Sequence, residues 1–354
     1  MKKGLAAGAA ITGAGLLATK AASAQTIVST PTAGDIAILN FLAAAELIET
    51  DLWQQYAELG GLTPGQLPVE TAPFTPMNNY QAALMNLDPD GPQYISSNTL
   101  DELSHATFLN AYLQSKGAPP VNLDPFRTLP SSQAAGAQNI GRLTNLMNLT
   151  VDTSWFTRYR SSANPEFGAT FPQAITLSNV PGIPRTNADY SLSNIQAIAN
   201  IAAFHFGFIE QGGSSLYATL AQKVSSLEVL KILLGIGADE VCHFLEWVDF
   251  AGNSVQPTLA PLAAGNGLPA FPNFDATDDP SIQTNLIFPV PCEFISPNLP
   301  KCAVIRPSSP GQIDAVGAVN ALIADGLFIG QSPTFINLLF EMANAADAAQ
   351  RVIF

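Results

Sequence analysis

Residues 101–105 read Asp-Glu-Leu-Ser-His, and residues 239–243 read Asp-Glu-Val-Cys-His. Each stretch places a glutamate three residues before a histidine, and residues three apart in a helix lie on one face. The chain of 354 residues contains only three histidines, and two of them occupy the same place in this pattern. Each stretch therefore offers one carboxylate and one imidazole in a single direction, which is half of a transition-metal site.

A further glutamate precedes each of these stretches. Glu46 and Glu210 both follow apolar runs without lysine or arginine, and an aromatic residue stands seven positions after each of them, at Trp53 and Tyr217. A buried charge in such surroundings is costly unless a cation compensates it. The chain thus contains an internal repeat of Glu-x6-aromatic followed by Asp-Glu-x-x-His. Its four carboxylates would balance two divalent cations.

The repeat falls on four long predicted helices, at residues 35–59, 99–116, 192–224 and 226–250. Asp35 and Asn98 are the expected N-caps of the first two, because their side chains accept hydrogen bonds from free helix amides. Ser225 and Glu228 have the spacing of a capping box at the start of the fourth.

The remaining segments differ in composition. Pro, Asn, Ser and Gly are frequent in residues 60–97, 117–190 and 252–311. A short helix is expected near residues 131–160, and a helical pair is expected at residues 312–329 and 332–353. Loops of this length are uncommon unless they cover or line something. They also contain aromatic residues such as Trp155, so we expect packed coverings and not linkers.

The repeat resembles the ligand pattern of the ferritin-like di-iron and di-manganese proteins, in which two helices give one Glu each and two give Glu-x-x-His. Within that superfamily the chain is most similar to exported ferritin-like domain proteins related to plant desiccation-related proteins. The resemblance covers the four repeat-bearing helices, about a third of the chain. It implies an all-α fold, a ferritin-like four-helix bundle with long loop insertions and an extra C-terminal helical region.

The resemblance also implies a domain organisation and a ligand set. A bundle domain would span residues 25–251 with insertions at 60–97 and 117–190, and a Pro-rich segment with C-terminal helices, residues 252–354, would pack on it. Two iron or two manganese ions would have six ligands: Glu46, Glu102, His105, Glu210, Glu240 and His243. Glu102 and Glu240 would bridge the ions, and each remaining Glu–His pair would complete one ion. Asp101 and Asp239 would hydrogen-bond ligand histidines and fix their orientation.

Three nearby residues compete for roles at this site. Glu49 is an alternative to Glu46, but the aromatic residue at plus seven aligns Glu46 with Glu210, so Glu49 is expected to be exposed. His205 lies five residues before Glu210, off its helical face, and is expected in the core. Tyr217 is most simply a core aromatic, with a redox role as the alternative.

The N-terminus predicts export. Lys2 and Lys3 precede a short apolar stretch that ends in the small-residue sequence Ala22-Ser-Ala24, which is typical of a signal peptide at residues 1–24. An uncleaved membrane anchor is the alternative. No later run is long enough for a transmembrane helix. A secreted or periplasmic location would let Cys292 and Cys302 pair, whereas Cys242 is expected to be a buried free thiol.

The net charge of the chain excludes some classes of partner. Without residues 1–24, 11 basic residues face 28 acidic ones, a net charge of −17 that repels nucleic acid and anionic lipid and attracts cations. Metal ions are therefore expected partners, and the resemblance adds a small oxidant. An oligomer is possible, but not a ferritin cage, because the insertions would obstruct a closed shell.

Two classes of function follow from the resemblance. One is oxygen or peroxide redox chemistry in stress protection, catalase-like or ferroxidase-like, which would make the protein a di-metal oxidoreductase. The other is a non-catalytic metal-binding or structural role in desiccation or stress.

Overall fold

The computed structural model describes residues 30–62, 75–158, 171–277, 289, 295–296, 298–304 and 314–352. The regular structure of these residues is helical, with eight α-helices, short 3-10 helices and isolated β-bridges in place of strands. The all-α prediction is confirmed for this part of the chain. The predicted signal peptide and Cys292 lie outside it. None of the described helices is long and apolar enough to cross a membrane.

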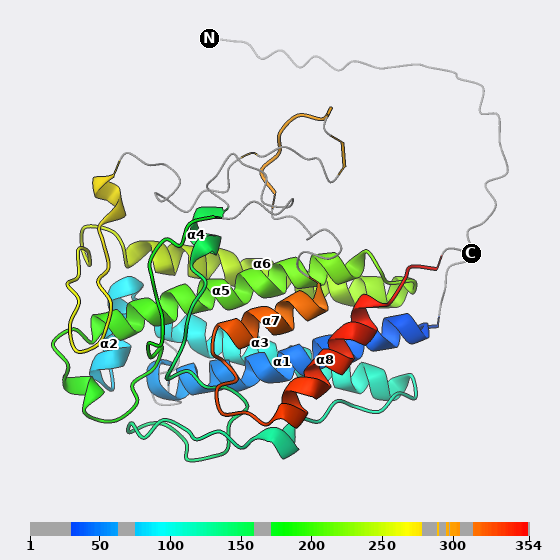
Figure 1. Ribbon diagram of the computed structural model, residues 1–354, viewed down its shortest axis with the longest axis horizontal. Helices are drawn as coiled ribbons and strands as arrows, with labels where there is room; N and C mark the ends of the chain where they lie inside the picture. Colours follow the sequence, from blue (N-terminus) through cyan, green and yellow to red (C-terminus); the bar gives the residue numbers. More distant parts are fainter. Residues whose placement is uncertain are drawn as a thin grey trace, which may run out of the picture.

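Four long helices form the body of the molecule (Figure 1). They are α1 (Ala33–Gly60), α3 (Gly91–Ser115), α5 (Gln196–Ala221) and α6 (Leu227–Asn253). α1 packs along α3, α5 packs along α6, and α3 also contacts α6. Buried aromatic side chains fill the space between the pairs, where Trp53 of α1 and Trp247 of α6 stack with ring centroids 5.2 Å apart. The two halves of the sequence repeat therefore face one another.

Several predicted boundaries are wrong. α3 begins at Gly91 and not at residue 99, with Pro92 in its first turn, where a missing N–H costs no helical bond. A separate helix, α2 (Asn79–Leu87), lies in a segment expected to be irregular. Within residues 131–158, α4 (Ser154–Arg158) is the single α-helix. α5 begins at Gln196 after a 3-10 turn at Asp189–Ser191.

The caps of α1 and α6 also differ from prediction. Thr32 caps α1, with Oγ1 accepting from the amide of Asp35 at 3.1 Å while the Asp35 carboxylate accepts from the amide of Thr32 at 2.8 Å. Asp35 also accepts from the amides of Ser225 and Ser226, at 2.8 and 3.2 Å. It thus ties the start of α1 to the start of α6. The predicted capping box of Ser225 and Glu228 is wrong, because α6 has no side-chain cap.

The described part of the segment 117–190 packs on the helices. Arg142 is fully buried and pairs with Glu58 of α1. The carboxylate of Asp51 accepts hydrogen bonds from the backbone and the hydroxyl of Thr144, at 3.0 and 2.7 Å. Trp155 is buried and donates to the backbone of α5. The segment is a covering held by specific polar contacts.

Two C-terminal helices lie against α1 and α5. α7 (Ala315–Ala324) contacts α5, and α8 (Pro333–Asp347) contacts α1 and α7 (Figure 1). The carboxylate of Asp347 accepts from the amides of Ala315 and Val316, at 3.0 and 2.9 Å, and pairs with Lys223 at 3.1 Å. The end of α8 is therefore fixed to the start of α7 and to the chain just after α5.

Candidate metal centre

Six side chains from the four long helices converge in the interior, and we call them the carboxylate–histidine cluster: Glu46 of α1, Glu102 and His105 of α3, Glu210 of α5, and Glu240 and His243 of α6. All six are buried, with exposed fractions of 8% or less. They form two groups whose potential ligand atoms lie within 4.8 Å of one another. One group is Glu46, Glu102, His105 and Glu240, and the other is Glu102, Glu210, Glu240 and His243. Glu102 and Glu240 belong to both.

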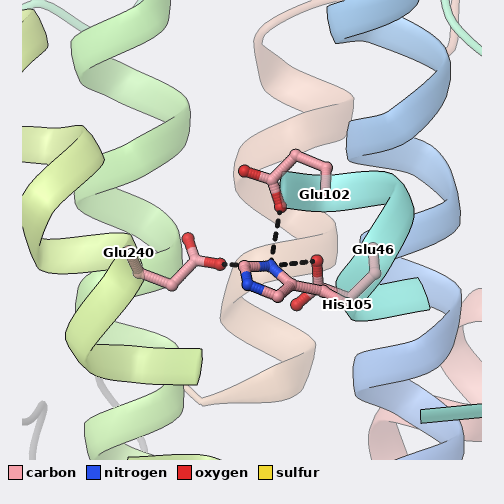
Figure 2. Close-up of side chains that lie close together, drawn as sticks. All are labelled: Glu46, Glu102, His105 and Glu240. Atoms are coloured by element: carbon pink, nitrogen blue, oxygen red, sulfur yellow. Dashed lines mark hydrogen bonds and ion pairs between the residues drawn. The ribbon is translucent and has the colours of Figure 1, made fainter. Parts of the chain in front are cut away.

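His105 lies at the centre of the first group. Its Nδ1 atom is 3.2 Å from Oε2 of Glu102, 3.3 Å from Oε2 of Glu46 and 3.7 Å from Oε1 of Glu240. Figure 2 shows these three carboxylates approaching the imidazole from different sides. They come from α3, α1 and α6, so the group depends on the packing of three helices.

His243 has the equivalent place in the second group. Its Nδ1 atom is 3.2 Å from Oε1 of Glu102 and 3.4 Å from Oε2 of Glu210. The two oxygens of Glu102 thus face different histidines, whose ring centroids are 6.4 Å apart. A carboxylate in this position can contact two ions at once.

The two aspartates of the repeat lie beyond the histidines and cross between the halves. Oδ2 of Asp239 is 3.2 Å from Nε2 of His105, and Oδ2 of Asp101 is 3.5 Å from Nε2 of His243. Each aspartate therefore contacts the histidine of the other helix. With Nε2 directed at an aspartate, Nδ1 of each ring is directed into the cluster.

Several carboxylate oxygens in the cluster are buried without a hydrogen-bond partner among the described residues. They are Oε2 of Glu46, Oε2 of Glu210 and both oxygens of Glu240. Buried polar atoms are nearly always satisfied, and a buried carboxylate is costly unless a positive charge compensates it. The donor set, four carboxylates and two imidazoles, fits divalent iron or manganese ions.

The cluster favours bound protons when no cation compensates it. Burial, followed by the neighbouring carboxylates, raises the pKa of Glu102 and of Glu240 well above the usual value. Burial opposes the charged form of His243, but the carboxylates of Glu210, Glu240 and Asp239 together outweigh burial and raise the pKa to about 10. Divalent cations would displace such protons, because metal ligands must be deprotonated.

Asn98 is a site residue that the sequence analysis placed outside the site. Its Nδ2 atom donates to Oε1 of Glu102 at 2.8 Å and to Oε1 of Glu210 at 3.1 Å, and its Oδ1 atom accepts from Nε1 of Trp247 at 2.9 Å. Asn98 precedes Glu102 by four residues, so a correct helix start would have placed both on one face.

Two other residues lie closer to the cluster than expected. Tyr217 is buried and its hydroxyl donates to Oε1 of Glu46, so it contacts a cluster carboxylate directly. Glu49, predicted to be exposed, is half-buried. Burial and then the charges of Glu46 and Glu210 raise its pKa well above the usual value. The prediction that Glu49 is exposed is wrong, since Glu49 lines a cavity together with residues of α5 and α7.

His205 lies in the core, as predicted. It is fully buried, its Nδ1 atom is 2.8 Å from the hydroxyl of Tyr56, and its Nε2 atom is 3.2 Å from Oδ2 of Asp325. Cys242 is an exposed free thiol, so the prediction that it is buried is wrong. Cys242 adjoins His243, but its side chain is exposed on the outside of α6. Cys302 is also an exposed free thiol, and its expected partner lies outside the described residues.

Comparisons with protein-family models, with curated proteins and with solved structures find no match.

Proposed function

We propose that the protein is an exported, ferritin-like four-helix bundle that binds two iron or two manganese ions in the carboxylate–histidine cluster and uses them in oxygen or peroxide redox chemistry. The observation that carries the proposal is the sharing of Glu102 and Glu240 between two groups of ligand atoms. Two adjacent sites with two common carboxylates are what a bridged pair of ions requires. The packing of α1 on α3 and of α5 on α6 supports the bundle.

The side chains divide into clear roles. Glu46 and His105 would complete the coordination of one ion, and Glu210 and His243 that of the other, with Glu102 and Glu240 shared by both. Asp239 contacts Nε2 of His105, and Asp101 contacts Nε2 of His243. These contacts would hold each imidazole in the tautomer that leaves Nδ1 free to bind an ion. Tyr217 would orient Glu46 through its hydroxyl.

A bound pair of redox-active ions would supply the electrons for reduction of oxygen or peroxide. The chain itself holds the ligands in a buried site, which excludes most water. Disproportionation of peroxide needs no external reductant, so it suits a protein that acts outside the cytoplasm. Oxidation of ferrous iron is the neighbouring reaction of the same cluster.

The proposal is tested by purifying the protein from cells supplied with iron and manganese. We expect elemental analysis to give about two ions per chain, because four carboxylates balance the charge of two divalent cations. We also expect the protein to consume peroxide or to oxidise ferrous iron. Two ions without turnover would favour the non-catalytic alternative. Less than one ion per chain under both supplies would refute the metal site.

Ligand variants make the test specific. Glu102→Ala and His243→Ala should each lower the metal content sharply, whereas His205→Ala should not, because His205 lies outside both groups of ligand atoms. Circular dichroism of each variant checks that the helices are retained. Equal metal content in all three variants would contradict the ligand assignment.

A further inference from the structure

A cavity of about 280 Å³ lies between α1, α5 and α7, beside the carboxylate–histidine cluster. Most of its wall is apolar, and the largest of these side chains are Phe41, Phe208, Ile209, Leu216 and Leu322. Small-molecule sites in proteins have this character, a mainly apolar wall with a few polar groups.

The cavity wall nearest the carboxylate–histidine cluster includes two glycines, which have no side chain. It contains Gly212 and Gly213 of α5 and the half-buried Glu49 of α1. A β-carbon at Gly212 would meet no atom within 4 Å, so this wall faces open space. Gly213 lines the cavity and also lies against the carboxylate of Glu240, so the cavity adjoins the cluster.

The polar groups at the α4 side of the cavity include one arginine. The guanidinium of Arg158 is half-buried and has one hydrogen bond within the described residues, from Nη1 to Oε1 of Gln211 at 3.3 Å. Asp152 also lines the cavity. Burial opposes its charged form, but hydrogen bonds from Ser154 and Gln173 to its Oδ1 atom, and then the nearby charge of Arg158, outweigh burial and lower its pKa. An arginine has five N–H donors, so Arg158 retains donors for an anion.

We propose that this cavity binds a small organic carboxylate with an apolar chain, its carboxylate on Arg158 and its chain against the aromatic and aliphatic wall. Arg158 suits this headgroup because a planar guanidinium can form two parallel hydrogen bonds with a carboxylate. The volume equals that of about nine molecules of liquid water, so the cavity accommodates a ligand of about ten non-hydrogen atoms. The site goes beyond the metal chemistry, and binding there does not require the ions.

Octanoate is a suitable probe, since it has a carboxylate and an apolar chain of the right size. Calorimetric titration of the chelator-treated protein should show one saturable site per chain. The neutral analogue 1-octanol should bind at least tenfold more weakly. Absence of saturable octanoate binding, or equal affinity for 1-octanol, would overturn the proposal. Metal content is measured separately, so failure here is distinguishable from failure of the proposed metal site.

Variants locate the binding site. Ala318 and Ala321 of α7 line the cavity, and Ala321 is exposed at its rim. Ala318→Phe and Ala321→Phe should each weaken octanoate binding at least tenfold by occupying the cavity. Ala324→Phe, on the same helix but away from the cavity, is the matched control and should bind like the wild type. Unchanged binding in both cavity variants would place the ligand elsewhere and refute the proposal.

A separate variant tests the proposed contact between Arg158 and the carboxylate of the ligand. Arg158→Gln should weaken octanoate binding about tenfold and leave the binding of 1-octanol unchanged. Equal loss for both probes would mean that Arg158 acts only by shaping the cavity, which contradicts the carboxylate assignment. Thermal melting curves of all four variants establish that each protein is folded.

Discussion

Gly213 of α5 lies so close to Glu240 of α6 that a β-carbon at position 213 would overlap Oε2 of the glutamate. Glu240 belongs to both groups of ligand atoms, so its place depends on the missing side chain. The two halves of the sequence repeat differ at the position three residues after the first glutamate. Gly213 stands three residues after Glu210, whereas Glu49 stands three residues after Glu46.

Gly213→Ala should therefore displace Glu240 and lower the metal content. Gly212→Ala is the matched control, because a β-carbon there meets nothing within 4 Å. Replacement of a helical glycine by alanine is otherwise stabilising by about 0.5–1 kcal/mol. We expect normal metal content and a slightly raised melting temperature for the control. Elemental analysis of both proteins decides the matter, and normal metal content in Gly213→Ala would contradict the prediction.

Asn98 should tune metal affinity without being a ligand. Asn98→Ala removes the donor to Glu102 and Glu210 and the acceptor of Trp247. Loss of such supporting hydrogen bonds typically lowers metal affinity about 10–100-fold. Competition with a chelator of known affinity measures the change. We expect the limiting stoichiometry at saturating metal to be unchanged, and a lost ion there would instead make Asn98 a ligand.

The buried pair of His205 and Asp325 should contribute to stability and not to metal binding. His205→Ala leaves Asp325 buried without its partner, and breaking such a pair typically costs about 3–5 kcal/mol. Urea unfolding measures the loss, while elemental analysis should still give wild-type metal content. The double variant His205→Phe/Asp325→Leu should lose less than His205→Ala, since it leaves no charge unpaired. An equal or greater loss in the double variant would argue against this explanation.

Glu246 should make the stability of the metal-free protein depend on pH. Burial raises its pKa to about 7; His243 opposes this shift, and Asp88, Glu210 and Asp101 add to it. The fold therefore favours the protonated form. The stability that the protonated Glu246 contributes is fully present below about pH 4.5, the usual pKa of a glutamate. It is lost as the pH rises through about 7, the pKa of Glu246 in the folded protein.

Glu246→Gln removes this ionisation. In chelator-treated protein, the melting temperatures of the variant and the wild type should lie closest at low pH. The variant should then become progressively more stable than the wild type as the pH rises through neutrality. A difference that stays constant with pH would show that Glu246 does not have the raised pKa.

The repeat was sufficient to predict which side chains share a helical face. Residues three apart on a helix must share a face, so Glu102 with His105 and Glu240 with His243 were predictable pairs. Their convergence with Glu46 and Glu210 needed the resemblance to a known ligand pattern. The histidine in the core, His205, followed from the same helical geometry.

The errors have physical causes that sequence spacing does not contain. Asn98 and Asp35 are good capping residues, but each lies inside a helix that begins earlier, at Gly91 and at Ala33. Glu49 shares a cavity wall with residues of α5 and α7, which are distant in sequence. Cys242 occupies the outer face of α6 although its immediate neighbours are largely apolar, because α6 is covered on one side only.

The contact of α8 with α1 has a consequence for biosynthesis. A nascent chain of about 250 residues contains every residue of the carboxylate–histidine cluster, yet its first helix lacks the surface that residues 333–347 provide. Contacts between the two ends of a sequence form late, because closing a long loop carries a large entropic cost. Synthesis of residues 333–347 should therefore precede stable ion capture by the cluster.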